Sequence, residues 1–108
     1  MFSIIIPTLN NLNYLKMCIN SIEKNSKYNH EIIPHVNMGT DGTVDFLKLK
    51  KINFTYTNYN AGICEGVNKA AKKSKFNYIL YAHDDFYFCP DWDEILQNEV
   101  KKIGHKKF

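Results

Sequence analysis

The fold is decided by residues 2–22, which read FSIIIPTLNNLNYLKMCINSI. Phe2 to Pro7 form an apolar run closed by a proline, which is typical of a strand buried on both faces of a parallel sheet. Asn10 and Asn11 then offer two candidate N-caps for a helix. Apolar side chains recur beyond them at helical spacing, at Leu12, Leu15, Cys18, Ile19 and Ile22.

The rest of the chain repeats this alternation of strand and helix. Further strands are predicted over 32–36, 52–56 and 78–82, and further helices over 45–50, 62–71 and 92–102. Pro34 fits its strand poorly, because proline removes a donor from the hydrogen-bond ladder. The pattern predicts one α/β domain over residues 1–108, with a mostly parallel, Rossmann-like sheet, helices on both faces and right-handed crossovers.

Composition restricts the class of protein. The chain has 108 residues, 44% of them hydrophobic and 14% aromatic, which suits one packed core and excludes a disordered chain. No apolar run approaches the roughly 20 residues of a membrane span, and the start lacks the pattern of a signal peptide. The cysteines are few and far apart, which predicts a reduced, cytoplasmic protein; they are Cys18, Cys64 and Cys89.

The charge is mildly basic, at +3, and every basic residue other than histidine is a lysine. A phosphate site must therefore use lysine, backbone N–H groups or a metal, because no guanidinium is present. The lysines are scattered, so no nucleic-acid partner is expected. A lysine-rich end is read as a solvated helix end, with a membrane or partner contact as the alternative; its members are Lys101, Lys102, Lys106 and Lys107.

Polar residues follow each predicted strand at its carboxyl end, where open parallel sheets bind ligands. Asp84 and Asp85 come directly after the last strand, and their oxygens suit Mg²⁺ or Mn²⁺ unless they form a solvated loop. His83 is a metal ligand, a ribose contact or neither. Gly62 either lets backbone N–H groups approach an anion or simply begins a helix, and Asn37 either contacts a nucleobase or caps a turn.

The order of these segments resembles the donor half of inverting GT-A glycosyltransferases of a family 2-like type, over about residues 2–92. The family's Pro-Thr-Tyr-Asn is matched by residues 7–10, PTLN, and its Asp-Gly-Thr by residues 41–43. Its Asn-x-Gly element falls on residues 60–62, its later helix asparagine on Asn68, and its Asp-x-Asp metal motif on residues 83–85, with Pro90 following.

This resemblance implies a minimal GT-A fold and metal-dependent sugar transfer from a nucleoside-diphosphate sugar, a UDP-sugar in the first instance, to an unknown saccharide or other acceptor. It implies that Asp85, with Asp84, holds Mn²⁺ or Mg²⁺. The implied nucleotide-binding residues are Pro7, Thr8, Leu9, Asn10, Asn37, Asn60, Gly62, His83 and Asp84.

Three positions depart from the family pattern: Leu9 replaces an aromatic residue, Asn37 a carboxylate and His83 the first motif aspartate. The family's catalytic carboxylate and acceptor site lie beyond the matched region. Four carboxylates follow here, Asp91, Asp93, Glu94 and Glu99, of which Asp91 is the weak candidate for the base. The alternatives are a non-catalytic nucleotide-sugar-binding module, a donor-half subunit completed by another chain, and slow hydrolysis of the donor.

The C-terminal region is rich in apolar residues. Such residues beside a helix that is short for the surface it must cover predict self-association, with a two-fold homodimer as the simplest assembly. The residues expected to contribute are Phe86, Tyr87, Phe88, Trp92, Ile95, Leu96, Ile103 and Phe108.

Overall fold

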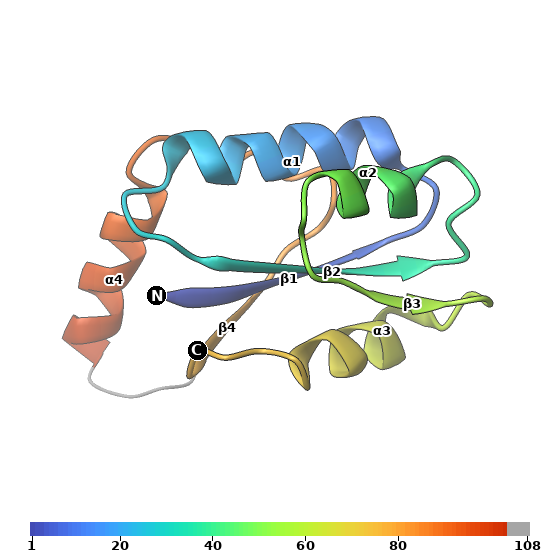
Figure 1. The fold of residues 1–108 in the computed structure, drawn as a ribbon. Helices are drawn as coiled ribbons and strands as arrows, with labels where there is room; N and C mark the ends of the chain where they lie inside the picture. The colour runs from blue at the N-terminus through green and yellow to red at the C-terminus, as the bar shows by residue number, and fades with distance from the viewer. Residues whose placement is uncertain (104–108) are drawn as a thin grey trace.

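The computed structural model describes residues 1–103, with the side chain of Ile103 excepted. A four-stranded sheet with the order β3-β2-β1-β4 is flanked by helices, and all its strand pairs are parallel, which confirms the predicted α/β fold (Figure 1). The elements are β1 (Phe2–Thr8), α1 (Leu12–Asn25), β2 (Glu31–Asn37), α2 (Thr43–Leu49), β3 (Thr55–Thr57), α3 (Gly62–Ala71), β4 (Tyr78–Tyr81) and α4 (Trp92–Ile103).

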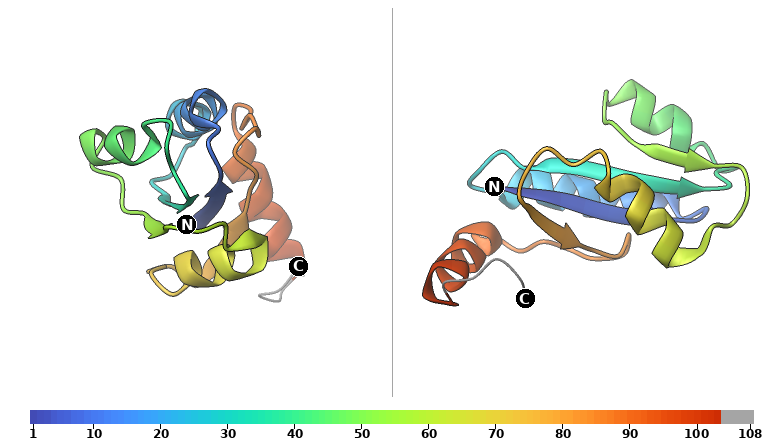
Figure 2. Two further views of the ribbon diagram at one scale, coloured as in Figure 1. Left: turned by 90° about the vertical axis from the view of Figure 1, so that its right-hand side faces the viewer. Right: turned by 90° about the horizontal axis from the view of Figure 1, so that it is seen from below.

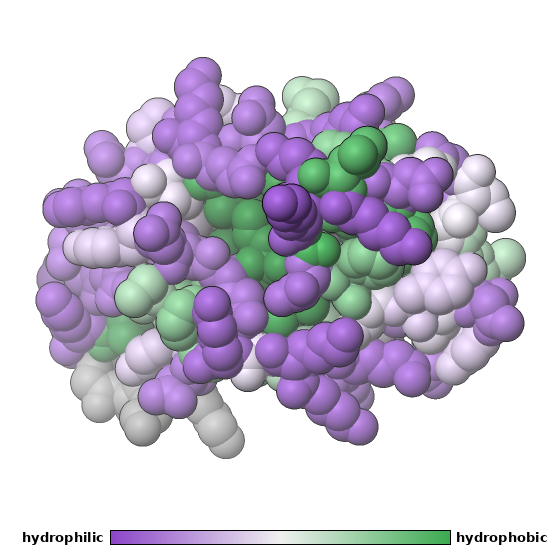
Figure 3. All heavy atoms as spheres, viewed as in Figure 1, coloured by the Kyte–Doolittle hydropathy of each residue, from purple (hydrophilic) through white to green (hydrophobic). Residues whose placement is uncertain are grey.

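Helices cover both faces of the sheet, with α1 and α2 on one face and α3 on the other (Figures 1 and 2). Side chains alternate along β1, so Ile4 and Ile6 pack in the core beneath α1 and α2 while Ile5 packs with Ile33 and Ala70 beneath α3. Figure 3 shows apolar side chains reaching the surface between the first two helices and the sheet. Each buried aliphatic side chain contributes about 1.5–3 kcal/mol, so β1 anchors the fold.

Pro34 lies in β2 at a position where its missing donor is tolerated. The Met38 N–H donates to the Thr57 carbonyl at 2.9 Å, so β2 N–H groups at even positions point toward β3. The ladder between these strands begins at His35 opposite Thr55, one residue after the proline. The position of the missing N–H of Pro34 therefore faces β3 at the residue where pairing between the two strands stops, which accounts for the three-residue length of β3.

The predicted strand over 52–56 was wrong in its bounds for this reason. Ile52 and Phe54 precede β3 and pack against the core from the loop, and Tyr56 is 49% exposed. The inward positions of β3 are occupied by Thr55 and Thr57, both of which hydrogen-bond to His35. The register of β3 against β2 is thus set by the buried His35, a polar partner that the hydrophobic periodicity of the sequence does not reveal.

Helix α4 packs at the amino end of the sheet. The Trp92 ring centroid lies 6.1 Å from that of Phe2, 5.0 Å from that of His30 and 4.7 Å from that of Phe88. Asp93 on the next position is fully buried and accepts hydrogen bonds from the chain that enters β2. The helix thereby closes the amino edge and leaves the carboxyl edge open.

The expected self-association surface is smaller than the sequence indicates. Phe88 is only 9% exposed, and Trp92 and Leu96 pack against the core, so these three residues do not form a free apolar face. Phe86, Tyr87 and Ile95 are exposed, whereas the Ile103 side chain and Phe108 lie outside the described part of the chain. Dimerisation through this region stays a prediction.

Candidate functional site

A hollow of about 290 Å³ opens at the carboxyl edge of the sheet, between β1, the end of β2, the start of α3 and the end of β4. Ligands bind in this crevice in open parallel sheets. Seven of the predicted nucleotide-binding residues line it, together with two that the sequence did not single out. The lining residues are Pro7, Thr8, Leu9, Asn37, Asn60, Gly62, Ile63, Tyr81 and His83.

The loop that follows β4, residues 83–85, carries Asp84 and Asp85 and is called the acidic loop below. A hydrogen bond joins it to the end of β1. The Thr8 hydroxyl, in a residue only 2% exposed, donates to Asp84 Oδ2 at 2.8 Å. Asp84 is half-buried, and Asp85 next to it is exposed. Thr8 thus orients the first carboxylate from below, and Asp85 is left facing solvent.

Asn37 is held by its side-chain oxygen. Its Oδ1 accepts a hydrogen bond from the Ala61 N–H at 3.0 Å and lies 3.4 Å from the Thr57 hydroxyl oxygen. Ala61 immediately precedes α3, so one side chain joins the end of β2 to the start of that helix. Asn37 is 4% exposed and still lines the hollow.

A buried histidine supports this arrangement from the α3 side of the sheet. Thr57 donates its hydroxyl proton to the Tyr59 carbonyl at 2.7 Å, so its oxygen accepts from His35 Nε2 at 3.2 Å. His35 Nδ1 in turn lies 2.7 Å from the Thr55 hydroxyl. Burial lowers the pKa of His35 below its usual 6.5, which keeps the ring neutral at physiological pH.

Gly66 is required at the point where α3 crosses this histidine. A Cβ built on Gly66 would stand 2.7 Å from His35 Cδ2, a ring atom that is buried and cannot move aside. The glycine therefore sets the distance between α3 and β2. That distance in turn brings Ala61 within reach of the Asn37 side chain.

The loops after β1 and β2 are cross-linked by two side chains. Asn10 Oδ1 accepts from the Thr40 N–H at 2.8 Å, and Asp41 Oδ2 accepts from the Leu12 N–H at 3.0 Å. Asp41 also binds the N–H and hydroxyl of Thr43 at the start of α2. Hydrogen bonds from Thr43 and the Leu12 N–H hold the pKa of Asp41 below 3.8 although partial burial acts to raise it.

This pair of contacts corrects the expected capping of α1. Asn11 occupies the N-cap position but makes no capping hydrogen bond, and Asp41 from the next loop supplies it instead. Asn10, expected at the nucleotide, is outside the lining of the hollow and engaged with Thr40. Its position braces the loop that carries Leu9.

The start of α3 borders the hollow through Gly62 and Ile63. Gly62 adopts a φ of 76°, a conformation that other residues adopt only with strain, and its N–H donates to Asn60 Oδ1 at 3.1 Å. The helix runs ten residues, and its amino end carries partial positive charge. In a chain without arginine, this end is a natural place for an anion.

Aromatic rings cluster at the end of β4, and two of them, Tyr81 and His83, line the hollow. His83 lies between Tyr81 and Phe86, with ring centroids 5.1 Å away on each side. Tyr81 is 38% exposed and lines the hollow, as does the 56% exposed Ile63. Sequence reasoning missed both, although the position of Tyr81 beside the carboxyl end of the predicted strand 78–82 was a usable signal.

The acidic loop fits a hard divalent cation in its donor chemistry. Asp84 and Asp85 supply carboxylate oxygens, which Mg²⁺ and Mn²⁺ prefer, and Mg²⁺ sites usually combine one or two carboxylates with water and substrate phosphates. Within residues 1–103, no group of three or more histidine, cysteine or acidic side chains gathers to hold a metal alone. The residues present therefore suit a cation shared with a bound diphosphate.

Asp91 lies at the other end of the molecule. Its N–H donates at 3.3 Å to the carbonyl of Asn25, the last residue of α1, and its own carbonyl accepts from Ile95 at the start of α4. Helix α1 begins at the carboxyl edge and ends at the amino edge, so Asp91 is not brought to the hollow (Figure 1). Asp93 is likewise at the amino edge, buried under α4.

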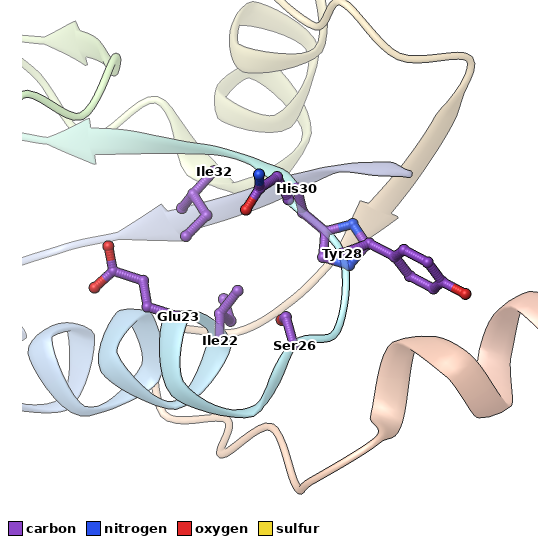
Figure 4. A pocket seen from close by; sticks show the side chains of 7 residues that line it. Ile22, Glu23, Ser26, Tyr28, His30 and Ile32 are labelled. Atoms are coloured by element: carbon purple, nitrogen blue, oxygen red, sulfur yellow. The ribbon is translucent and has the colours of Figure 1, made fainter.

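A second hollow, of about 340 Å³, opens at this amino edge between α1 and β2 (Figure 4). Three of its polar side chains are already bound: Ser26 accepts from Trp92 Nε1, His30 contacts both Asp93 and the Phe2 N–H, and Glu23 pairs with a lysine. It therefore has the character of a packing defect. Its lining residues are Ile22, Glu23, Ser26, Tyr28, Asn29, His30 and Ile32.

Several solved structures share this fold. The structure of S. aureus TarS 1–349 superposes with a TM-score of 0.83 at 20% identity, covering 94% of this chain and 32% of that one, and TarS has also been solved with UDP and with UDP-GlcNAc. The mannosyltransferase PcManGT from Pyrobaculum calidifontis, solved with GDP-Man and Mn²⁺, superposes with a TM-score of 0.76 at 18% identity, covering 96% of this chain and 32% of that one. The fold is thus that of the GT-A glycosyltransferases.

The chain belongs to the family described as Glycosyl transferase family 2, which it matches over residues 3–106. This confirms the resemblance seen in the sequence motifs. No curated protein sequence matches the chain. The chain spans about a third of the length of the solved structures it resembles. Among residues 1–103, no helix has both the length and the apolar character to cross a bilayer.

Proposed function

We propose that this chain is a single domain that binds the donor in a metal-dependent glycosyltransferase, and that the donor is a UDP-sugar. The observation that carries the proposal is that three features meet at one hollow: the start of α3, the Asn37 side chain and the acidic loop, which lines the hollow through His83 and whose Asp84 is hydrogen-bonded to the lining residue Thr8. They would receive the diphosphate, the base and a divalent cation respectively. The solved relatives bound to UDP, UDP-GlcNAc and GDP-Man with Mn²⁺ support the same class of ligand.

The two acidic residues have different tasks in this proposal. Asp85 is the exposed ligand of Mn²⁺ or Mg²⁺, and Asp84, fixed by Thr8, faces the ribose or the water around the cation. When bound, the cation would neutralise the negative charge of the diphosphate leaving group. Tyr81 offers the base the aromatic face that Leu9 does not provide.

Transfer itself needs a group that deprotonates the acceptor hydroxyl. Asp91 lies beside the end of α1, at the amino edge of the sheet, and is therefore too far from the hollow at the carboxyl edge to act as this base. Glu65 at the first turn of α3 is hydrogen-bonded to Tyr59, and Asp41 is engaged in capping two helices. We therefore propose that residues 1–103 bind the donor and that a complete transfer uses a base from additional polypeptide, with slow hydrolysis of the donor as the alternative outcome.

The test is calorimetry of the 108-residue chain with UDP-GlcNAc, in Mn²⁺ and again in EDTA. We expect binding in Mn²⁺ and at least tenfold weaker binding in EDTA, because two carboxylates repel an unneutralised diphosphate. Equal affinity in the two conditions would remove the metal from the proposal. Product analysis then separates free sugar, which indicates hydrolysis, from a glycoside, which indicates transfer.

A pair of matched variants locates the effect. Asp85→Asn should lose the response to Mn²⁺, whereas Asp91→Asn, which removes the same charge at the opposite edge, should keep it. If both variants respond to Mn²⁺ like the parent chain, Asp85 is not the metal ligand.

A further inference from the structure

The orientation of the Asn37 amide is fixed by its surroundings. Of the two polar atoms of the Asn37 amide only Oδ1 can accept the Ala61 N–H at 3.0 Å, so Oδ1 must point toward the start of α3. Rotating the amide would set Nδ2 against that N–H and leave two donors facing each other. The Thr57 hydroxyl, 3.4 Å from the same oxygen, lies on the same side.

The Nδ2 group of Asn37 consequently lies on the opposite side of the amide, away from the start of α3. It donates to no acceptor within residues 1–103, yet no side-chain nitrogen or oxygen there is both buried from solvent and without a partner. Asn37 is only 4% exposed, and its amide nitrogen Nδ2 must therefore be the part that reaches open volume. The open volume that Asn37 lines is the hollow at the carboxyl edge. A nearly buried, unpartnered donor aimed into a pocket is a specificity element.

We propose that Asn37 recognises the nucleobase as a hydrogen-bond donor, through a carbonyl oxygen that uracil and cytosine share, and that the site therefore accepts CDP as well as UDP. This inference rests on the proposed function and refines its substrate class to pyrimidine nucleoside diphosphates. Oδ1 is occupied, so the side chain has no acceptor to offer the N3–H of uracil, the group that distinguishes uracil from cytosine at that position. A carboxylate at residue 37 would accept there and discriminate.

The experiment compares UDP with CDP by calorimetry in Mg²⁺. For the parent chain we expect dissociation constants within about threefold of each other, because both bases present the same carbonyl to Asn37. In Asn37→Asp, one oxygen keeps the Ala61 hydrogen bond and the other becomes an acceptor in the hollow. The ratio should then shift toward UDP by about tenfold or more, the usual effect of one hydrogen bond to a charged group.

Asn60→Asp is the matched control, because it adds the same charge to the lining of the same hollow and retains an oxygen for the Gly62 N–H. It should weaken UDP and CDP alike and leave their ratio unchanged. A parent chain that prefers UDP by tenfold overturns the inference even if Asn37→Asp does not fold, and so does a folded Asn37→Asp with an unchanged ratio. If neither nucleotide binds the parent chain, the proposed function itself falls; binding without the expected ratios refutes only the role of Asn37.

Discussion

Replacing Asp93 by asparagine tests how the amino edge is held together. The Asp93 carboxylate is fully buried and accepts from the backbone N–H groups of Lys27 and Tyr28 at 2.9 and 2.8 Å, from His30 Nε2 at 2.8 Å and from the Glu94 N–H at 2.9 Å. His30 Nδ1 accepts from the Phe2 N–H, which leaves the ring proton on Nε2 for Asp93. One side chain thus joins α4, the start of β1 and the loop entering β2.

The magnitude follows from these bonds. An asparagine retains one oxygen, so Tyr28 and His30 keep a neutral acceptor while Nδ2 is set against the Glu94 N–H. Each hydrogen bond to a charged group contributes about 1.5–3 kcal/mol, and a buried donor left without a partner costs about 1–3 kcal/mol. We expect a loss of about 3–5 kcal/mol, of the order seen when a buried charged cluster is broken. For a domain of this size, that lowers the melting temperature by at least about 12 °C.

The assay is urea unfolding followed by circular dichroism, with Asp91→Asn as the control for charge. Asp91 is exposed, and only its backbone makes hydrogen bonds at the end of α1 and the start of α4, so this variant should unfold like the parent. Equal midpoints for Asp93→Asn and Asp91→Asn would refute the reasoning, since the buried bonds would then contribute nothing measurable.

The Asp93 carboxylate also makes the free energy of unfolding depend on pH in the acid range. Burial acts to raise the pKa of Asp93, but hydrogen bonds from Tyr28, His30 and Lys27 outweigh it and hold the pKa below the usual 3.8. The unfolded chain therefore binds this proton more tightly. The stabilisation is complete above about pH 5, begins to fall as the pH approaches the unfolded value of 3.8, and is lost as the pH falls through the lower folded value. Asp93→Asn should show a flatter loss of stability in acid than the parent chain.

Two further predictions concern other parts of the fold. Gly66→Ala should lower the free energy of unfolding by about 1–3 kcal/mol, because the new Cβ would stand 2.7 Å from a ring carbon of His35; an unchanged urea midpoint would contradict this. Burial and the two carboxylates of the acidic loop raise the pKa of the Cys18 thiol to about 12, so a thiol reagent at pH 8 should modify the exposed Cys64 and Cys89 in the native protein and Cys18 only after unfolding.

The sequence was sufficient for the order of the elements because their signals are local. The apolar run of Phe2–Pro7, the helical spacing from Leu12 to Ile22 and the glycine at position 62 each indicate an element without reference to the rest of the chain. Strand ends collect at one edge of a parallel sheet, so most of the lining of the hollow was also predictable.

What could not be predicted depends on contacts between distant residues. Asp41 caps a helix that begins 29 positions before it, and Asp93 accepts from groups more than 60 positions away. The bounds of β3 depend on which side of β2 the Pro34 nitrogen faces, which only the assembled sheet determines. Asn37 was correctly placed at the hollow, but whether it donates or accepts there follows from Ala61 and not from its own identity.

Pro34 also has a consequence for the behaviour of many molecules together. Sheet edges with long rows of free N–H and C=O groups pair with the edges of other chains and lead to aggregation. The outermost strand on this side of the sheet is β3, which has only three residues. The neighbouring stretch of β2 contains Pro34, which has no N–H to donate. Because of Pro34, the edge formed by β2 and β3 is too short to serve as a template for a strand of another chain. We expect this to disfavour aggregation at the high local concentrations of newly made protein.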